Sequence, residues 1–76
     1  MKLKYVITEN LQPILFGLGI SHDEVTKHKV ISAGFCNFYP HSETGDFVVK
    51  TFGDSFSLKL KPSPDDAYLI EKLLNR

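Results

Sequence analysis

The stretch KVISAGFCNFY, residues 29–39, decides how the rest of the chain can fold. Apolar side chains occupy both of its alternating faces: Ile31, Ala33, Phe35 and Tyr39 on one, and Val30, Gly34, Cys36 and Phe38 on the other. A strand that is apolar on both sides is usually central in its sheet, with other elements covering both faces. We therefore expect a sheet built around this strand, which ends at Pro40.

A first hairpin precedes the central strand. Residues 2–8 alternate apolar and polar side chains, with Tyr5 among the apolar ones, and this is the period of a half-buried strand. Glu9 and Asn10 predict a two-residue turn. That turn would place Tyr5 opposite Ile14, with the apolar faces of both strands on the same side of the sheet.

A second hairpin is predicted from DFVVKTFGDSFSLKLK, residues 46–61. Its turn falls at Gly53, because glycine adopts the conformation needed at the first central position of a type II′ turn without steric cost. The resulting register pairs residues that share one face: Thr51 with Phe56, Val49 with Leu58, and Phe47 with Leu60. The other face of this hairpin would carry lysines and Phe52.

Two helices are indicated by their first residues. The segment SHDE, residues 21–24, has the spacing of a capping box and predicts a short helix near residues 22–27. The segment PSPDDAYLIEKLLNR, residues 62–76, predicts a longer helix that is capped by Ser63 and has Pro64 in its first turn. The apolar stripe of this helix, which can cover one face of the sheet, consists of Ala67, Ile70, Leu73 and Leu74.

Together these elements predict an α+β fold. We expect a mostly antiparallel meander sheet of about five strands, with the C-terminal helix packed on one face. A chain of 76 residues, 42% of them hydrophobic, is enough for one core and too apolar for a disordered chain. Residues 1–76 therefore form a single domain.

Charge and cysteine content limit the classes of partner and compartment. Nine Lys and Arg balance nine Asp and Glu, so the net charge alone favours neither nucleic acid nor a membrane surface. No apolar run reaches the roughly 18 residues of a membrane-spanning helix, and the single cysteine forms no internal disulfide. We expect a cytoplasmic protein without a membrane partner.

Cys36 and His41 raise the question of a catalytic thiol. An imidazole that takes the proton of a nearby thiol creates a reactive thiolate. Cys36, however, lies in the middle of the predicted central strand, whereas His41 follows Pro40 in a loop. We therefore interpret Cys36 as a packing residue and expect neither a catalytic residue nor an enzyme.

Neither a metal site nor a cofactor is expected. Two zinc ligands on one helix face are three or four residues apart, whereas His22 and His28 are six apart, and Cys36 and His41 add no standard spacing. The segment FGLGISH, residues 16–22, is similar to the start of a dinucleotide-binding fingerprint but lacks its third glycine. A chain-reversing turn is the better interpretation.

A lysine-rich face is the most informative feature for function. On the predicted pleat, lysines and apolar residues share the side of the sheet that the long helix leaves uncovered. The candidate binding residues there are Lys4, Tyr39, Val48, Lys50, Phe52, Lys59 and Lys61. Lysines among aromatic residues are typical of sheets that bind single strands, on which bases stack and lysines follow phosphates. Lysines also occupy exposed faces and edges that have no ligand, where they block edge pairing.

Three short segments carry a family resemblance: SAGFC at residues 32–36, GDSFSL at residues 53–58 and PDDAYLI at residues 64–70. Over residues 30–74 the chain resembles a family of small uncharacterised bacterial proteins, often carried by prophages, with a pattern of SAGFC, GxSxSL and PxDA. The resemblance implies a bacterial or phage cytoplasmic setting and implies no activity.

The favoured function is a small non-catalytic protein-interaction module that binds another protein, including a second copy of itself as a homodimer. One helix covers one face of the sheet and leaves Val6, Leu15, Val48 and Phe52 in need of another cover. The alternative is single-stranded nucleic-acid binding through the lysine and aromatic face. An enzyme that depends on cysteine and histidine is the third hypothesis.

Overall fold

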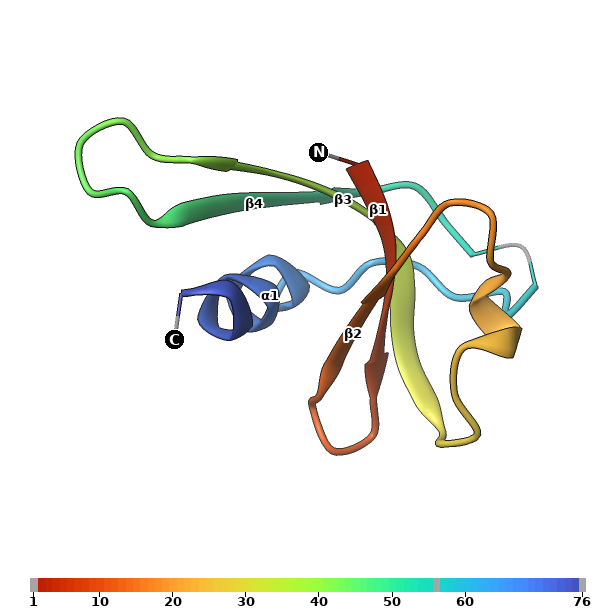
Figure 1. Cartoon of the computed structure of the whole chain (residues 1–76). Coiled ribbons are helices and arrows are strands. Elements are labelled where there is room, and N and C mark those ends of the chain that lie inside the picture. The colour runs from red at the N-terminus through yellow and green to blue at the C-terminus, as the bar shows by residue number, and fades with distance from the viewer. Residues whose placement is uncertain (1, 56, 76) are drawn as a thin grey trace.

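The computed structural model describes residues 2–55 and 57–75 and has an antiparallel sheet with one helix packed against it (Figure 1). Its elements, in chain order, are β1 (Lys2–Thr8), β2 (Pro13–Phe16), the 3-10 turn η1 (His22–Glu24), β3 (Val30–Pro40), β4 (Phe47–Phe52) and α1 (Asp66–Leu74). The sheet order is β2-β1-β3-β4. The α+β class is confirmed, with four described strands where about five were expected. The expected meander order is wrong, because β3 pairs with β1 and leaves β2 at the edge of the sheet.

The first core lies between the sheet and α1. Its buried members come from β1, β3, β4 and α1: Tyr5, Ile7, Cys36, Val49 and Ile70. Ala67, Leu69 and Leu74 pack against this cluster. Three members of the predicted helical stripe, Ala67, Ile70 and Leu74, therefore face the sheet. Leu73 instead lines a surface groove with Leu11 and Pro13.

Within residues 2–55 and 57–75, no helix has the length and apolarity to cross a membrane.

The second core lies on the opposite face of the sheet. Val6, Phe16 and Ala33 are buried there under the partly buried Val25, Leu58 and Leu60. The predicted burial of Leu58 and Leu60 beneath α1 is therefore wrong. The described residues after β4 cross to the other side of the sheet, so the two leucines cover the end of it that β1 and β2 form.

The predicted hairpin across Gly53 is also wrong. Strand β4 pairs with β3, with Val49 opposite Phe38 and Thr51 opposite Cys36, and no ladder joins it to residues 55 and 57–61. Gly53 at φ 71° and Lys59 at φ 56° turn the backbone, and a single bridge joins Ser55 to Leu60. The pairing with β3 extends over all six residues of β4. The position predicted for Phe56 lies outside the described residues.

The first hairpin has a longer loop than expected. The Leu11 N–H donates to the Thr8 carbonyl, and the Thr8 N–H donates to the Gln12 carbonyl. Leu11 has φ 61°, which is the left-handed residue that follows a type I turn in a three-residue loop. The added residue shifts the register, so Tyr5 lies opposite Leu15 and not opposite Ile14.

A β-bulge at Ile31 changes the faces of the central strand. Ile7 pairs with Ser32 and Thr8 pairs with Val30, so Ile31 has no partner in β1. The extra residue reverses the alternation on one side of the bulge. Val30, which the alternation placed with Cys36, therefore packs in the second core, and Ile31 is exposed.

The Asp66 carboxylate joins α1 to the two central strands. It accepts hydrogen bonds from the Tyr5 hydroxyl at 2.6 Å, the Ser32 hydroxyl at 2.8 Å and the Ser63 backbone N–H at 2.8 Å. Asp66 is 2% exposed, so water does not replace these donors. Ser63 thus contributes its N–H at the helix start and makes no side-chain cap bond there, unlike the predicted cap.

The predicted capping box at residues 21–24 does not form. The Ser21 hydroxyl donates to the Asp23 carboxylate at 2.6 Å, and Ser21 makes no cap bond to the backbone. Only the Ser21 carbonyl, which accepts from the Glu24 N–H, closes the turn. The expected short helix near residues 22–27 is therefore a 3-10 turn of three residues.

Replacing Asp66 should be among the most damaging single changes in this chain. Asp66→Ala leaves two buried hydroxyl donors and the partly buried Ser63 N–H without this acceptor, and each buried unsatisfied group costs about 1 to 3 kcal/mol. Urea denaturation should show the loss of about 3 kcal/mol or more, or an unfolded chain. Tyr5→Phe removes one donor and should cost about 1 kcal/mol. Asp65→Ala and Tyr68→Phe, at exposed positions, are the controls, and losses equal to theirs would contradict the role of Asp66.

Stability should also fall in alkali through Tyr5. Burial, and next the hydrogen bond to Asp66, raise the pKa of the Tyr5 phenol above its ordinary value. Above about pH 10 the unfolded chain then holds fewer protons than the native chain, so the free energy of unfolding decreases as pH rises, by up to about 1.4 kcal/mol per pH unit. The difference in stability between wild type and Tyr5→Phe should therefore shrink between about pH 9 and about pH 11. A difference that stays constant over this range would show that Tyr5 ionises alike in both states.

Candidate functional site

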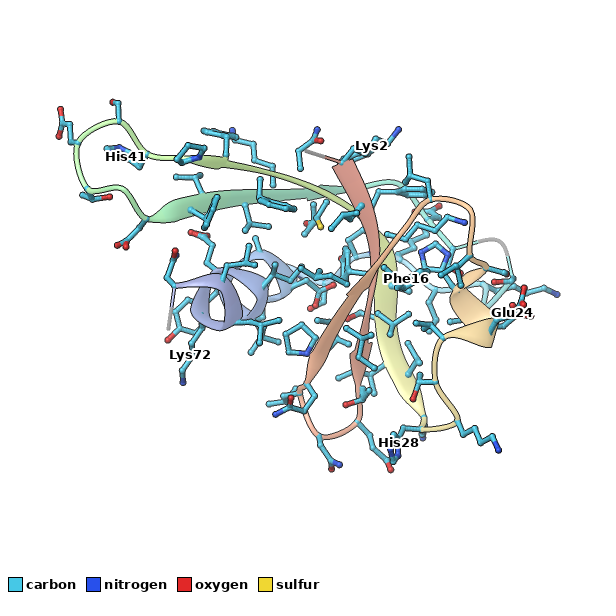
Figure 2. The ribbon with its side chains drawn as sticks, viewed as in Figure 1. Lys2, Phe16, Glu24, His28, His41 and Lys72 are labelled. Carbon is cyan, nitrogen blue, oxygen red and sulfur yellow. The ribbon has the colours of Figure 1, made fainter. Side chains whose placement is uncertain are left out.

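The structure does not bring Cys36 and His41 together. The Cys36 side chain is fully buried in the first core, and burial raises the pKa of its thiol. His41 is exposed at the tip of the β3–β4 hairpin, where its Nδ1 accepts the Glu43 N–H at 3.3 Å (Figure 2). A raised pKa is the opposite of what an activated thiolate requires.

The other two histidines also lie apart from each other. His28 is exposed, whereas His22 is buried and donates from Nε2 to the Gly34 carbonyl at 2.8 Å, since a carbonyl only accepts. The His22 ring also meets Phe16 and Phe35 edge to face. Across residues 2–55 and 57–75, no three His, Cys, Asp or Glu side chains gather where they could hold a metal ion.

Beyond the second core, the described elements leave part of one side of the sheet uncovered (Figure 1). Figure 1 shows α1 on one side of β3 and β4 and no other described helix or strand on the opposite side. The register places eight side chains on that side, and we call this surface the open face: Lys2, Lys4, Phe35, Asn37, Tyr39, Val48, Lys50 and Phe52. It continues from the second core along the strands to the β3–β4 end of the sheet.

Two stacked phenylalanine rings form the centre of the open face. Phe35 lies directly opposite Phe52, with ring centroids 5.8 Å apart and planes inclined by 21°. The Lys2 ammonium lies 5.5 Å from the Phe35 centroid and 5.3 Å from the Phe52 centroid. At these distances a cation is attracted to the faces of both rings. The open face therefore combines an aromatic pair with a cation held beside it.

The rows beside this pair repeat the same mixture. Asn37 lies opposite Lys50, and Tyr39 lies opposite Val48. Tyr39 is 47% exposed and Phe52 is 37% exposed, so both rings are accessible to a ligand. The Lys4 ammonium donates to the Ile20 carbonyl at 2.8 Å, which leaves it further N–H donors.

The predicted site residues divide into two groups. Five of them lie on the open face: Lys4, Tyr39, Val48, Lys50 and Phe52. Lys59 and Lys61 belong to the chain between β4 and α1, where they line a hollow of about 250 Å³ with Asp54 and Leu60. They stand beside the sheet and not on it, because the fifth strand expected to carry them is absent from the described chain.

Phe35 is the site residue that sequence reasoning missed. Its signal was present, because Phe35 and Tyr39 alternate on one face of residues 29–39. What was lacking was the register of β3 on β4, which places Phe35 beside Phe52. Without that register, Phe52 had no aromatic partner.

Charge is segregated between the sheet and the rest of the molecule. None of the four described strands contains Asp or Glu, whereas Lys2, Lys4 and Lys50 all point to the open face. The acidic residues lie in the turns, the loops and the region of α1. A chain of zero formal net charge thereby presents one cationic surface.

Comparisons of the chain with protein-family models, with curated proteins and with solved structures give no match. The functional argument therefore depends on the geometry of the open face.

The thiol of Cys36 should react slowly in the native protein. Burial and its raised pKa keep it protonated and inaccessible near neutral pH, so a thiol reagent should label it only when the protein opens. Labelling of denatured protein gives the reference rate. A native rate equal to the denatured rate would contradict the buried position and would restore the hypothesis of a reactive cysteine.

Proposed function

We propose that the open face binds single-stranded nucleic acid. The observation that carries this proposal is the stacked pair of Phe35 and Phe52 with the Lys2 ammonium beside both rings. Platforms for single strands join aromatic rings, on which bases stack, to cations that neutralise phosphates. Both components occur here on one surface of adjacent strands.

The lysine side chains can contact phosphates without any change in the backbone of the sheet. Lys2 and Lys50 are exposed, and each has a long flexible side chain with three N–H donors. The contact of Lys2 with the rings is weak at an exposed site, so its ammonium can exchange the rings for a phosphate. A base can then contact the aromatic surface that Lys2 leaves.

The distribution of charge favours an anionic ligand despite the neutral total. With no acid on any described strand, phosphates that follow β3 and β4 meet lysines and neutral side chains only. Local fields of this kind concentrate anions at a surface even when the net charge is zero. Lys59 and Lys61 lie on the chain after β4, where they share a hollow with Asp54.

The second candidate is the non-catalytic protein-interaction module that self-associates. It is favoured by the exposed apolar surface of Tyr39 and Phe52 and by the position of β4 at the edge of the sheet. The sequence favoured this candidate because Val6 and Leu15 were expected to need a cover. In the structure Val6 is buried in the second core and Leu15 packs against the first core, so these two residues no longer favour it. A bacterial or phage cytoplasmic setting belongs to both candidates, and the enzyme hypothesis gains no support from Cys36.

Fluorescence anisotropy with a labelled deoxythymidine oligomer of about ten nucleotides tests the proposal. Binding should weaken between about 50 and 200 mM salt, with a logarithmic slope of about −0.7 for each phosphate neutralised. Phe52→Ala should weaken binding about ten-fold, since a base loses its stacking partner. Lys50→Ala should lower the magnitude of the slope by about 0.7.

Lys72→Ala and Tyr68→Ala are matched controls, because both side chains are exposed on α1, away from the open face (Figure 2 labels Lys72). Neither should change the affinity or the salt slope. A protein that binds no oligomer at low salt, but sediments above monomer mass and dissociates on Phe52→Ala substitution, would overturn the proposal in favour of self-association.

A further inference from the structure

A hollow of about 190 Å³ lies at one end of the open face, and we call it the corner pocket. Its lining residues come from β1, β3, η1 and the turn after β4: Lys4, Ser21, His22, Phe35, Asp54 and Ser57. Lys4 and Phe35 belong to the open face as well, so a strand that crosses the stacked rings reaches the corner pocket directly.

One wall of the corner pocket is aromatic and held in place. The Phe35 ring stacks on Phe52 and meets the His22 ring edge to face, with centroids 5.6 Å apart. The His22 ring is fixed in turn by its hydrogen bond to the Gly34 carbonyl and is 4% exposed. A planar group that enters the pocket therefore meets a rigid apolar surface.

The remaining walls carry polar groups of opposite kinds. The Asp54 carboxylate is exposed and makes no hydrogen bond or ion pair with any residue among 2–55 and 57–75. The Lys4 ammonium keeps N–H donors beyond the one given to Ile20. The Ser21 and Ser57 hydroxyls add groups that accept as well as donate. As far as the described residues reach, the pocket thus offers the two acceptor oxygens of Asp54 and the cationic donor of Lys4 beside an aromatic wall.

A carboxylate on an otherwise cationic surface disfavours phosphate at that point and favours a neutral ligand with donors. Asp54 accepts only, through two oxygens, and so matches a group with two adjacent N–H donors. Among the bases, guanine presents such a pair on its Watson–Crick edge, from N1 and the 2-amino group. Its O6 and N7 are acceptors that lysine recognises. Adenine and cytosine present one amino donor beside a ring acceptor, and thymine presents one N–H between carbonyls.

We propose that the corner pocket recognises a single unstacked guanine in the strand bound to the open face. This inference rests on the proposed single-strand binding and adds a base preference to it. Asp54 accepts from N1 and the 2-amino group, Lys4 donates toward the acceptor edge, and Phe35 packs against the plane of the base. Unpaired bases are commonly recognised in this way, by stacking combined with hydrogen bonds to their edges.

The test compares three oligomers that differ at one central position: all thymidine, one guanine, and one inosine, which lacks the 2-amino group. The single-guanine oligomer should bind about five-fold or more tightly than all-thymidine, the lower end of what a bidentate contact contributes. The inosine oligomer should lose most of this gain. A single guanine per strand prevents the oligomers from associating through guanine quartets.

Asp54→Asn should bring the ratio of guanine to thymidine affinity close to one, because an amide offers the guanine a single acceptor. Glu24→Gln, which removes an equal charge from the exposed side of η1, should keep the wild-type ratio. Thermal melts of both variants check that the fold persists.

Two outcomes separate the failure of this inference from the failure of the proposed function. If all-thymidine binds with the expected salt slope but guanine adds nothing, or if Asp54→Asn keeps the preference, the corner pocket does not recognise guanine while single-strand binding stands. If no oligomer binds, both proposals are overturned.

Discussion

The buried carboxylate of Asp66 is the contact on which the packing of the helix against the sheet depends. Tyr5 from β1 and Ser32 from β3 donate to it, and the Ser63 N–H donates from the turn before α1. A buried acceptor with three donors fixes direction as well as distance, which apolar contacts alone do not. It sets the start of α1 above the two central strands, so Ile70, one turn later, reaches the first core.

The path of the chain after β4 explains why part of one face of the sheet stays open. After β4 the chain passes close to Gly34, where an added Cβ would lie 2.9 Å from the Pro62 ring and 3.0 Å from the Gly53 and Phe52 carbonyls. Only glycine permits this approach. Leu58 and Leu60, from this segment, cover Val6 and Ala33 together with Val25. Beyond that second core the described chain supplies no further layer, and Phe35, Phe52 and their neighbours remain at the surface.

The open face shows how a neutral chain can carry an electrostatic function. Every second residue of β1, β3 and β4 points to the same face of the sheet, so lysines far apart in the sequence gather on one surface. The acids stay outside the strands, and Asp54 lies at the end of the open face, where it lines the corner pocket and the hollow beside Lys59 and Lys61. Net charge averages these positions, whereas a ligand at a surface responds to the nearest groups within about a Debye length. This separation is the basis of both proposals.

The sequence by itself determined the central strand at residues 29–39, the alternation of β1, the apolar stripe of α1 and the shared face of Lys4, Lys50 and Phe52. These features follow from periodicity and composition, which act within one segment. Pairing and register depended on the tertiary structure, because a one-residue change in a turn or a bulge moves every side chain to the other face. The left-handed Leu11 and the bulge at Ile31 are such changes, and neither position is a glycine, the residue that would have indicated it in the sequence.

The partner of β4 was decided in the same way. Residues 47–52 alternate well enough to pair with either neighbour, and Gly53 favours a local turn. In the folded chain the six residues of β4 pair with β3, and no described residue after Gly53 adds a strand on the other edge of β4. The register of β4 on β3 places Phe35 beside Phe52, and no pattern within either strand specifies that register.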